Sequence, residues 1–289
     1  MRRRVLFVML GAVAAIIGSP PALGRTAAEA ACRPVQRGGH RTPRDRENFT
    51  HGQVVAMLAD LRRALAGQRV RLDGPIVVPV RFHVIASADR GRLTPAEVDA
   101  QIATLNRAYS TARLSFRLVS TDLTTDSDWF EHPQRYERAI KSRLGRGGPG
   151  TLNLYTAAVG TDVLGFSTFP QAYRVSPGID GVVIDYRTLP GGEIPHFNRG
   201  YTAVHEIGHW LGLFHPFQNG CQAPGDGVDD TPYEAAPTQG CPSFKDTCPQ
   251  PGTDLVHNFM DYSYDDCMTE FTAGQGELIH SVWLAYRSK

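Results

Sequence analysis

The sequence predicts one α/β domain that runs from about residue 70 to the end of the chain. Three observations carry this prediction. The chain has 289 residues, 42% of them hydrophobic and 20% charged, so it can bury a core and lacks the composition of a disordered protein. Apolar runs with the length and period of strands alternate with helical patterns. No run of 18 apolar residues follows the N-terminal segment, which argues against a polytopic membrane protein.

The first elements of this domain follow residue 75. Residues 78–84 are apolar at every second position, the period of a half-buried strand. The next four residues with a clear signal are Thr94-Pro95-Ala96-Glu97, which combine an N-cap, a proline in the first turn and a capping-box Glu. They open a helix whose apolar face consists of Val98, Ile102, Leu105 and Tyr109.

The remaining elements are expected in a fixed order. Strands are predicted at residues 114–118, 152–154, 165–169 and 182–184, and a second helix around residues 201–212. A last helix begins at Thr272, where Gln275 completes a capping box. The order is therefore β-α-β-β-β-β-α, followed by a loop-rich region with one helix.

The N-terminal segment has the pattern of a secretory signal. Three arginines at residues 2–4 precede an apolar run at 5–17 and small residues at 22–24, so residues 1–24 are interpreted as a signal peptide. Secretion is expected, with no stable membrane insertion after signal cleavage. The alternatives are the twin-arginine route and a retained N-terminal anchor. Residues 25–69 have one short helical stretch at 54–65 and too few apolar residues for a core, and are interpreted as a propeptide.

Charge is distributed unevenly along the chain. Residues 1–24 carry a net charge of +3 and residues 25–69 carry nine Arg against four acids, a net charge of +5. Because the whole chain has a net charge of +1, residues 70–289 hold −7. An acidic body argues against nucleic acid as a partner and suits cations or basic peptides, although an ordinary solvated acidic surface is the alternative.

The segment from His205 to His215 carries the chemistry. On a helix, side chains four residues apart point the same way, so His205 and His209 can bind one metal ion. Glu206, the next residue after His205, can reach the open coordination position of that ion. Gly212 can adopt a positive φ and end the helix, which lets His215 approach from a third direction. Three neutral nitrogens with one free position are the ligand set of a catalytic Zn²⁺.

This motif is specific. Five specified positions should occur by chance in a chain of this length with odds on the order of one in ten thousand. Three alternatives remain: histidines buried in an ordinary core, a non-catalytic zinc- and calcium-binding secreted module, and a zinc hydrolase acting on esters or small amides.

The extended motif resembles that of the metzincins, and the chain is similar to the pappalysin family in particular. The likeness covers most of residues 75–289, including the stretches at 79–84, 164–170, 180–184 and 258–262. It implies a metzincin fold: a twisted mixed sheet with an active-site helix and a long backing helix. The resemblance divides residues 70–289 into an N-terminal subdomain to about residue 215 and a loop-rich C-terminal subdomain at 216–289.

The resemblance also implies a secreted endopeptidase that acts on proteins or peptides. In such an enzyme one catalytic Zn²⁺ lowers the pKa of its bound water. Glu206 is then expected to take the water proton as general base and to deliver it to the leaving amine. Met260 matches the Met-turn beneath the zinc ligands, with plain core packing as the alternative. Tyr262 is expected to stabilise the oxyanion, or else merely to pack. The edge strand at 165–169 should bind substrate in extended form.

An acid beside the last cysteine suggests a specificity. In the resembling enzymes the chain after the Met-turn walls the pocket for the residue that follows the cut. Asp266 at its base would pair with Arg or Lys, so cleavage before basic residues is the hypothesis. A solvated loop carboxylate is the alternative, and neighbouring Asp265 leaves the choice open.

A second metal is expected in the loop at residues 225–232. Three carboxylates and a threonine at this density suit a structural Ca²⁺, and by resemblance Asp226 and Thr231 match its ligands. The EF-hand pattern is not matched, and a plain acidic turn is the alternative.

The five cysteines are expected to form disulfides in an exported chain, with one left over. Sequence alone allows three pairings of the four clustered ones, and the resemblance implies Cys221–Cys248 and Cys241–Cys267. Cys32 stands alone in the expected propeptide. Its thiolate could occupy the open zinc position, which makes the propeptide an intramolecular inhibitor; a free surface thiol or an intermolecular bridge are the alternatives.

Overall fold

The computed structural model describes residues 49–67 and 74–288. The signal peptide expected at residues 1–24 and Cys32 lie outside these residues. Within the described part, no helix has both the length and the apolar character needed to cross a membrane.

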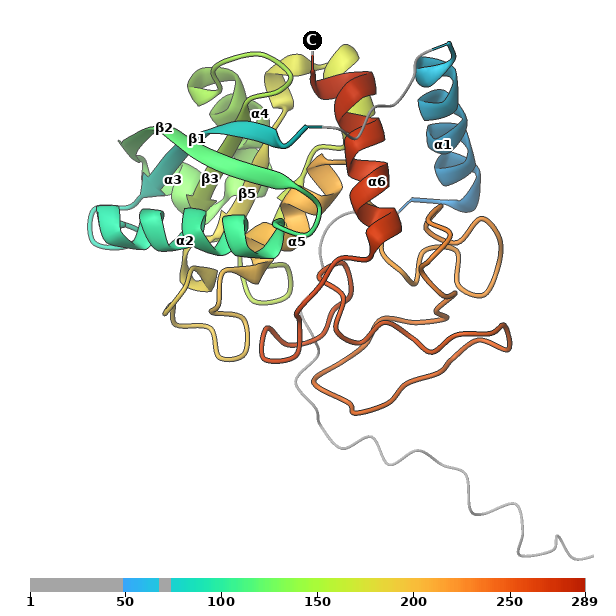
Figure 1. The fold of residues 1–289 in the computed structure, drawn as a ribbon. Helices are drawn as coiled ribbons and strands as arrows, with labels where there is room; N and C mark the ends of the chain where they lie inside the picture. The colour runs from blue at the N-terminus through green and yellow to red at the C-terminus, as the bar shows by residue number, and fades with distance from the viewer. Residues whose placement is uncertain (1–48, 68–73, 289) are drawn as a thin grey trace, which may run out of the picture. The chain divides into compact units, whose positions relative to one another are not determined.

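A five-stranded sheet forms the centre of the fold (Figure 1). Its strand order is β2-β1-β3-β5-β4, and β4 lies at one edge. The pairs β1/β2, β1/β3 and β3/β5 are parallel, whereas β4 runs antiparallel to β5. The predicted mixed sheet is thus confirmed. Its strands are β1 (Ile76–Ala86), β2 (Leu114–Thr125), β3 (Leu152–Ala157), β4 (Gly165–Ser167) and β5 (Val182–Asp185).

Helices cover both faces of the sheet. Helices α2 (Pro95–Ala108) and α5 (Tyr201–Trp210) pack on one face in the main apolar core. Helices α3 (Ser127–Glu131) and α4 (Pro133–Leu144) contribute Phe130 and Ile140 to a smaller core on the other face. The apolar face predicted for α2 is buried, and its N-cap Thr94 forms the expected capping box with Glu97.

Because helices cover both faces of the sheet, the structure differs from the prediction in the burial of β1 and in the presence of α3 and α4. Strand β1 is half-buried only in its first half, and its last five residues are all buried because their outer side chains, including Ile85, face the core beneath α3 and α4. Helices α3 and α4 were not predicted. Helix α4 buries Pro133, Ile140 and the charged Lys141. Its apolar stripe of Tyr136, Ile140 and Leu144 has the four-residue spacing of a helix, so a signal for this helix is present in the sequence.

The chain from residue 211 to 272 contains loops, turns and two isolated β-bridges. Helix α6 (Ala273–Val282) then begins at Thr272, whose capping box with Gln275 is the predicted one. A π-helical turn (Trp283–Arg287) follows it. Three short 3₁₀ turns complete the inventory at Pro170–Arg174, Pro177–Ile179 and Tyr186–Thr188.

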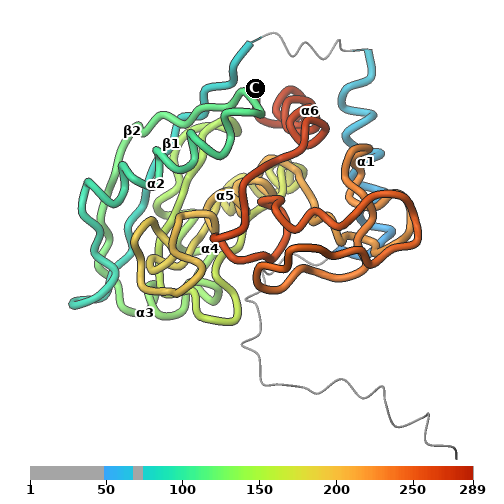
Figure 2. Tube along the Cα trace, turned by 60° about the horizontal axis from the view of Figure 1, so that its bottom comes forward, coloured from blue at the N-terminus to red at the C-terminus, as the bar shows by residue number. Residues whose placement is uncertain are grey.

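Helix α1 (His51–Leu65) packs on the domain rather than standing apart from it. It buries Val54 and Leu58 against Phe169 and Phe214, and Leu61 against α6 and the turn that follows. Both views place it beside α6 and the loops of the C-terminal region (Figures 1 and 2). The segment interpreted as a propeptide therefore obtains its core from the domain.

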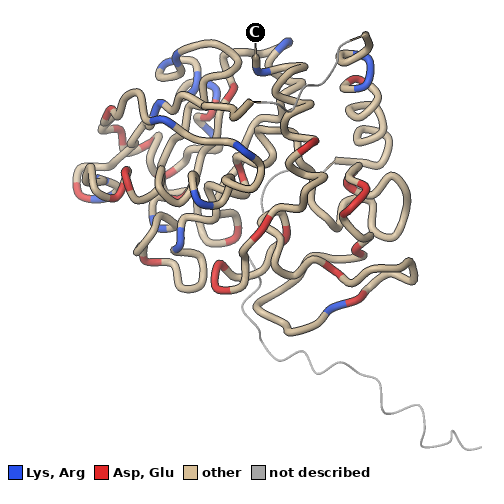
Figure 3. Tube along the Cα trace, in the orientation of Figure 1, with Lys and Arg blue, Asp and Glu red and all other residues tan. Residues whose placement is uncertain are grey.

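Acidic residues gather in the C-terminal region. Residues 216–289 contain 11 Asp and Glu but only three Lys and Arg. Figure 3 shows acidic positions along the loops of this region. In the sequence, Lys245 is the one Lys or Arg between residues 216 and 286. The acidic surplus of the body thus belongs to the loop-rich part of the chain.

Candidate metal centre and substrate cleft

Three histidines converge at the end of α5. The Nε2 atoms of His205, His209 and His215 lie 3.2 Å from one another in all three pairs. Tetrahedral ligands at a Zn–N distance of about 2.05 Å would lie about 3.3 Å apart. These three form the sole cluster of three or more potential metal-binding side chains among the described residues.

Local structure sets these rings in place. Helix α5 is capped at Leu211, and Gly212 follows with a φ of +91°, as predicted. The turn also directs the carbonyl of Leu213 at His209, whose Nδ1 lies 2.7 Å from it. Nδ1 of His205 lies 2.8 Å from the carbonyl of Phe259. Because the Nδ1–H groups of His205 and His209 are donated to carbonyls, their Nε2 lone pairs are directed to the point shared with His215, so the donor set fits Zn²⁺.

Met260 lies fully buried beneath α5. A Cβ atom at Gly208 would lie 2.3 Å from its Sδ, so only glycine at this helical position leaves room for the thioether. The backbone N–H of Met260 donates to Oδ1 of Asn258, whose amide pairs with Gln275 at the start of α6. Met260 is thus fixed from both sides.

Glu206 lies between α5 and the edge strand β4. Its side chain is buried and contributes to the cavity beside the histidines. A Cβ atom at Gly165 would lie 2.6 Å from Cγ and 2.8 Å from Oε1 of Glu206, so β4 passes directly over the carboxylate. The carboxylate and the sheet edge therefore face the same space.

Tyr262 lies next to two of the histidines. Its ring centroid is 5.8 Å from that of His205 and 5.1 Å from that of His215. Phe217 packs edge-on against it at 5.0 Å and stacks on His215 at 4.5 Å. Sequence reasoning did not single out Phe217, because an aromatic residue in a loop carries no periodic signal.

Comparison with known proteins identifies the family. A family model described as pregnancy-associated plasma protein-A matches residues 156–282. An extracellular metalloprotease of Neurospora crassa is 41% identical over 252 residues, which cover 84% of this chain and 88% of that protein. The chain belongs to the pappalysin family of metalloproteases.

Solved structures agree with this assignment. A promirolysin variant from Tannerella forsythia superposes with a TM-score of 0.69 at 26% identity, covering 81% of this chain and 88% of that one. Mature mirolysin in complex with a cleaved peptide gives a TM-score of 0.61 at 28% identity, covering 72% and 91%. The present pappalysin is a zinc metalloendopeptidase of the metzincin type, and it acts on peptide substrates.

Of the two neighbouring acids Asp265 and Asp266, Asp265 faces the cleft of this pappalysin. It is buried, lines the cavity with Glu206 and Tyr262, and accepts a hydrogen bond from the backbone N–H of Arg199 at 2.7 Å. Burial raises the pKa of Asp265 to about 7. Asp266, the acid chosen from sequence, does not line the cavity.

Asp266 instead lies at the surface, where its side chain is 41% exposed. Its carboxylate accepts hydrogen bonds from Nδ1 of His196, at 2.9 Å, and from the guanidinium of Arg199. These two partners, the His196 hydrogen bond first, lower the pKa of Asp266. Its charge is therefore already satisfied within the chain.

The acidic loop points one carboxylate inward. Asp226 is buried and accepts hydrogen bonds at Oδ1 from Thr231 Oγ1, at 2.6 Å, and from the backbone N–H of Val228. Its Oδ2 is buried without a hydrogen-bond partner among the described residues. Asp230, in contrast, turns away to accept from Thr272 and Gly274 at the start of α6.

The four clustered cysteines form two disulfides, Cys221–Cys248 and Cys241–Cys267. These are the pairs that the family resemblance implies. The second bridge ties the loop after residue 240 to the segment that carries Asp265. Cys32 lies outside the described residues.

Proposed function

We propose that this pappalysin hydrolyses extended peptides with Glu206 as general base and Tyr262 as the donor to the oxyanion. The observation that carries the proposal is the position of the Glu206 carboxylate, which lies between the histidine cluster and the edge strand β4. A base in that position lies within reach of a water molecule held at the histidines and of a peptide paired to the sheet edge.

The proton path follows from this arrangement. When bound, Zn²⁺ would lower the pKa of water and polarise the substrate carbonyl. Glu206 takes a proton from the water molecule while the water oxygen forms a bond to the carbonyl carbon of the substrate. The Tyr262 hydroxyl donates a hydrogen bond to the carbonyl oxygen as negative charge develops on it. Glu206 then delivers the proton to the amide nitrogen, the C–N bond breaks, and an acid and an amine leave.

Two substitutions test these roles. Glu206→Gln should lower kcat by about 10²- to 10⁴-fold because the base is lost, and Tyr262→Phe by about 10²- to 10³-fold. Both variants should keep their zinc content, measured by atomic absorption. Tyr264→Phe is the matched control, because Tyr264 stacks on His196 and does not line the cavity. A Glu206→Gln enzyme with the parent kcat would refute the mechanism.

We also propose a preference for Arg or Lys after the cut, with Asp265 rather than Asp266 as the recognising acid. The support is the buried position of Asp265 in the wall of the cavity. A cationic side chain entering there would stabilise the ionised carboxylate, whose pKa is raised by burial. Cut sites in a peptide library should lose the basic preference in Asp265→Asn and keep it in Asp266→Asn. The opposite result would restore Asp266 to the pocket.

Secretion and latency complete the proposal. Relatives of this chain are extracellular metalloproteases, and one structural relative is a precursor form. Residues 25–69 would act as an intramolecular inhibitor. In its support, Phe49 packs 4.6 Å from Phe169, whose ring in turn lies 5.4 Å from that of His209. Only the ring of Phe169 thus lies between Phe49, just before α1, and His209 of the metal centre. Activity of the chain beginning at residue 70 should exceed that of the chain beginning at residue 25.

Cys32 is proposed as the zinc-blocking thiol of this precursor. A thiolate is a strong ligand for Zn²⁺ and would exclude water. A Cys32→Ser precursor should therefore show activity before cleavage, in an assay with a quenched peptide. A variant as latent as its parent would exclude the thiol from this role.

Calcium is proposed at the loop that holds Asp226 and Thr231. A buried carboxylate oxygen without a hydrogen-bond partner is the feature in its favour. The parent should unfold at a higher temperature in millimolar Ca²⁺ than in a calcium-selective chelator, and Asp226→Asn should lose that difference. Equal shifts in both proteins would exclude this loop.

A further inference from the structure

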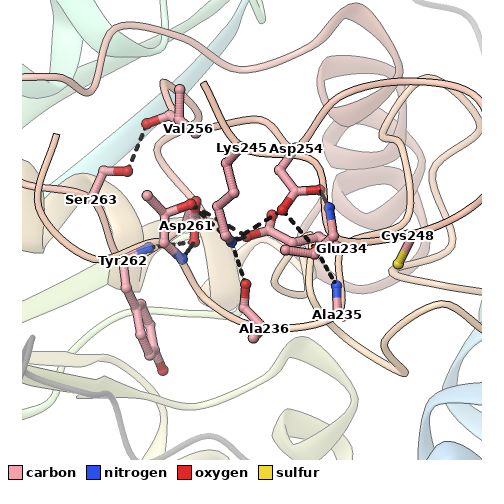
Figure 4. Close-up of polar contacts among 12 residues, drawn as sticks. Glu234, Ala235, Ala236, Lys245, Cys248, Asp254, Val256, Asp261, Tyr262 and Ser263 are labelled. Carbon is pink, nitrogen blue, oxygen red and sulfur yellow. Dashed lines mark hydrogen bonds and ion pairs between the residues drawn. The ribbon is translucent and has the colours of Figure 1, made fainter. Parts of the chain in front are cut away.

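Lys245 is the one Lys or Arg in the sequence between Arg199 and Arg287. It lies in the acidic C-terminal region, and its side chain is only 16% exposed. The ammonium contacts four oxygen atoms (Figure 4). They are Oε1 of Glu234, the carbonyl of Ala236, Oγ1 of Thr238 at 3.2 Å and Oδ2 of Asp254 at 3.2 Å.

These contacts fix two loop segments against each other. Asp254 accepts from the N–H and hydroxyl of Thr247, at 3.1 and 2.7 Å, and the same hydroxyl accepts from the backbone N–H of Ala235. The segment that begins at Glu234 is therefore bound to the loop containing Lys245 by several polar contacts. Neither segment contains a helix or a strand. These polar contacts hold residues 234–238 against the Lys245 loop, which is itself anchored by the disulfides of Cys241 and Cys248.

A hydrogen bond links this segment to Asp261, the residue before the proposed catalytic tyrosine. The backbone N–H of Thr238 donates to Oδ1 of Asp261 at 2.9 Å, and the backbone N–H of Tyr262 donates to the same oxygen at 2.7 Å. On the other side of Tyr262, the hydroxyl of Ser263 donates to the carbonyl of Val256 at 2.6 Å. Figure 4 shows the Tyr262 ring projecting from this network.

The ammonium also balances charge in a buried site. Glu234 and Asp261 are both fully buried, and each keeps one carboxylate oxygen without a hydrogen-bond partner among the described residues. Burial and the neighbouring Asp261 raise the pKa of Glu234 to about 8, although Lys245 opposes that rise. Removing the ammonium would leave these carboxyl groups to repel one another or to take up protons and rearrange.

We propose that Lys245 is a positioning residue for Tyr262, acting through Thr238 and Asp261. The ammonium holds residues 234–238 in place, the Thr238 N–H orients the Asp261 carboxylate, and that carboxylate fixes the backbone of Tyr262. The inference rests on the proposed catalytic role of Tyr262. It makes Lys245, which does not line the substrate cavity, necessary for the alignment of the phenol.

A double-mutant cycle on the zinc-loaded mature enzyme tests this inference. Lys245→Met should lower kcat by about tenfold or more, with KM and zinc content unchanged, because displacement of a reacting group by about 1 Å can cost 10²-fold. In a Tyr262→Phe background the same substitution should lower kcat less than about twofold, because the hydroxyl that Lys245 aligns is already absent. An equal factor in both backgrounds would overturn the proposal.

Lys141→Met is the matched control. Lys141 is also buried, and it contacts Glu137, Thr168 and the carbonyl of Gly181. Any effect of Lys141→Met should multiply with that of Tyr262→Phe, because Lys141 contacts α4 and the loops beside β4 and β5, whereas Lys245 contacts the segment 234–238. This control distinguishes loss of alignment from general destabilisation by an emptied lysine site.

A milder variant covers the case in which Lys245→Met does not fold. Lys245→Gln keeps a hydrogen-bond donor and should show the same non-additivity with a smaller loss of kcat. If both variants at Lys245 lose fold and zinc together, the residue has a general structural role and the proposal is wrong. If Tyr262→Phe alone keeps the parent kcat, the proposed role of the tyrosine fails first, and the cycle separates that outcome from an additive result.

Discussion

A methyl group added at Gly208 tests how tightly Met260 packs beneath helix α5. In Gly208→Ala the new Cβ would lie 2.3 Å from Sδ and 3.1 Å from Cε of Met260. Replacing Gly by Ala inside a helix stabilises it by about 1 kcal/mol, whereas overpacking a buried site costs about 1–3 kcal/mol. The net expectation is a loss of up to about 2 kcal/mol in the free energy of unfolding.

Gly276→Ala supplies the comparison. Gly276 is also buried in a helix, but its new Cβ would meet Ala112 at 3.4 Å, an ordinary contact. Gly276→Ala should therefore raise stability by about 1 kcal/mol, which corresponds to roughly 2–4 °C in Tm for a chain of this size. The difference between the two variants isolates the cost of overlap with Met260.

Thermal unfolding of the zinc-loaded proteins by circular dichroism is the assay. Gly208→Ala should unfold below its parent and Gly276→Ala above it. In a Met260→Ala background, which removes the thioether, Gly208→Ala should become stabilising. If Gly208→Ala raises Tm as much as Gly276→Ala does in the parent, the packing of Met260 against α5 has been misjudged.

Three further predictions concern the same domain. Gly165→Ala should lower kcat by about 10- to 100-fold in a peptide assay, because its Cβ displaces the Glu206 carboxylate. Asp180→Ala should cost about 3–5 kcal/mol in thermal unfolding, since it leaves the buried guanidinium of Arg287 without its carboxylate partner. Burial raises the pKa of Asp265 to about 7 in the folded state, so the stability that its protonated form contributes is lost as pH rises from about 4 through 7. Asp265→Asn should lack that loss when unfolding is measured across this pH range.

Each of these has its own control. Gly148→Ala adds a methyl group with no other atom within 4 Å and should keep the parent kcat. If Gly165→Ala is also as active as the parent, the Glu206 side chain can move away from the new methyl group without loss of function. An Asp180→Ala/Arg287→Met double variant should recover part of the stability. No recovery would assign the loss to the Trp210 indole, which also donates to Asp180. Parallel pH profiles for the parent and Asp265→Asn would show that the carboxyl titrates normally.

The metal centre could be predicted from the sequence because it is local. The three clustered histidines, whose arrangement fits a zinc site, lie within 11 residues, and helical geometry with one glycine turn brings them together. The same holds for the capping boxes at Thr94 and Thr272, where the signal spans four residues. Short-range geometry depends little on the rest of the fold, so it can be derived from spacing alone.

Other features depend on partners far along the chain. Asp265 and Asp266 are neighbours in sequence, and their different environments are set by Arg199 and His196, almost 70 residues earlier. The role of Lys245 is likewise invisible in the sequence, where a single lysine in an acidic loop resembles a solvated surface charge. Helix α4 is a different case, because its stripe of Tyr136, Ile140 and Leu144 has helical spacing and is a local signal that the sequence does contain.

The contacts of α1 bear on how the enzyme would become active. The helix is held by Val54, Leu58 and Leu61, by a hydrogen bond from Tyr286 to Asp60, and by one from Gln218 to the carbonyl of Phe49. None of these contacts depends on an intact chain after residue 69. A single cut there would break the chain, but the fragment that contains α1 would remain bound to the domain. Turnover would then begin with a lag, and that lag would shorten on dilution or after further trimming of the helix.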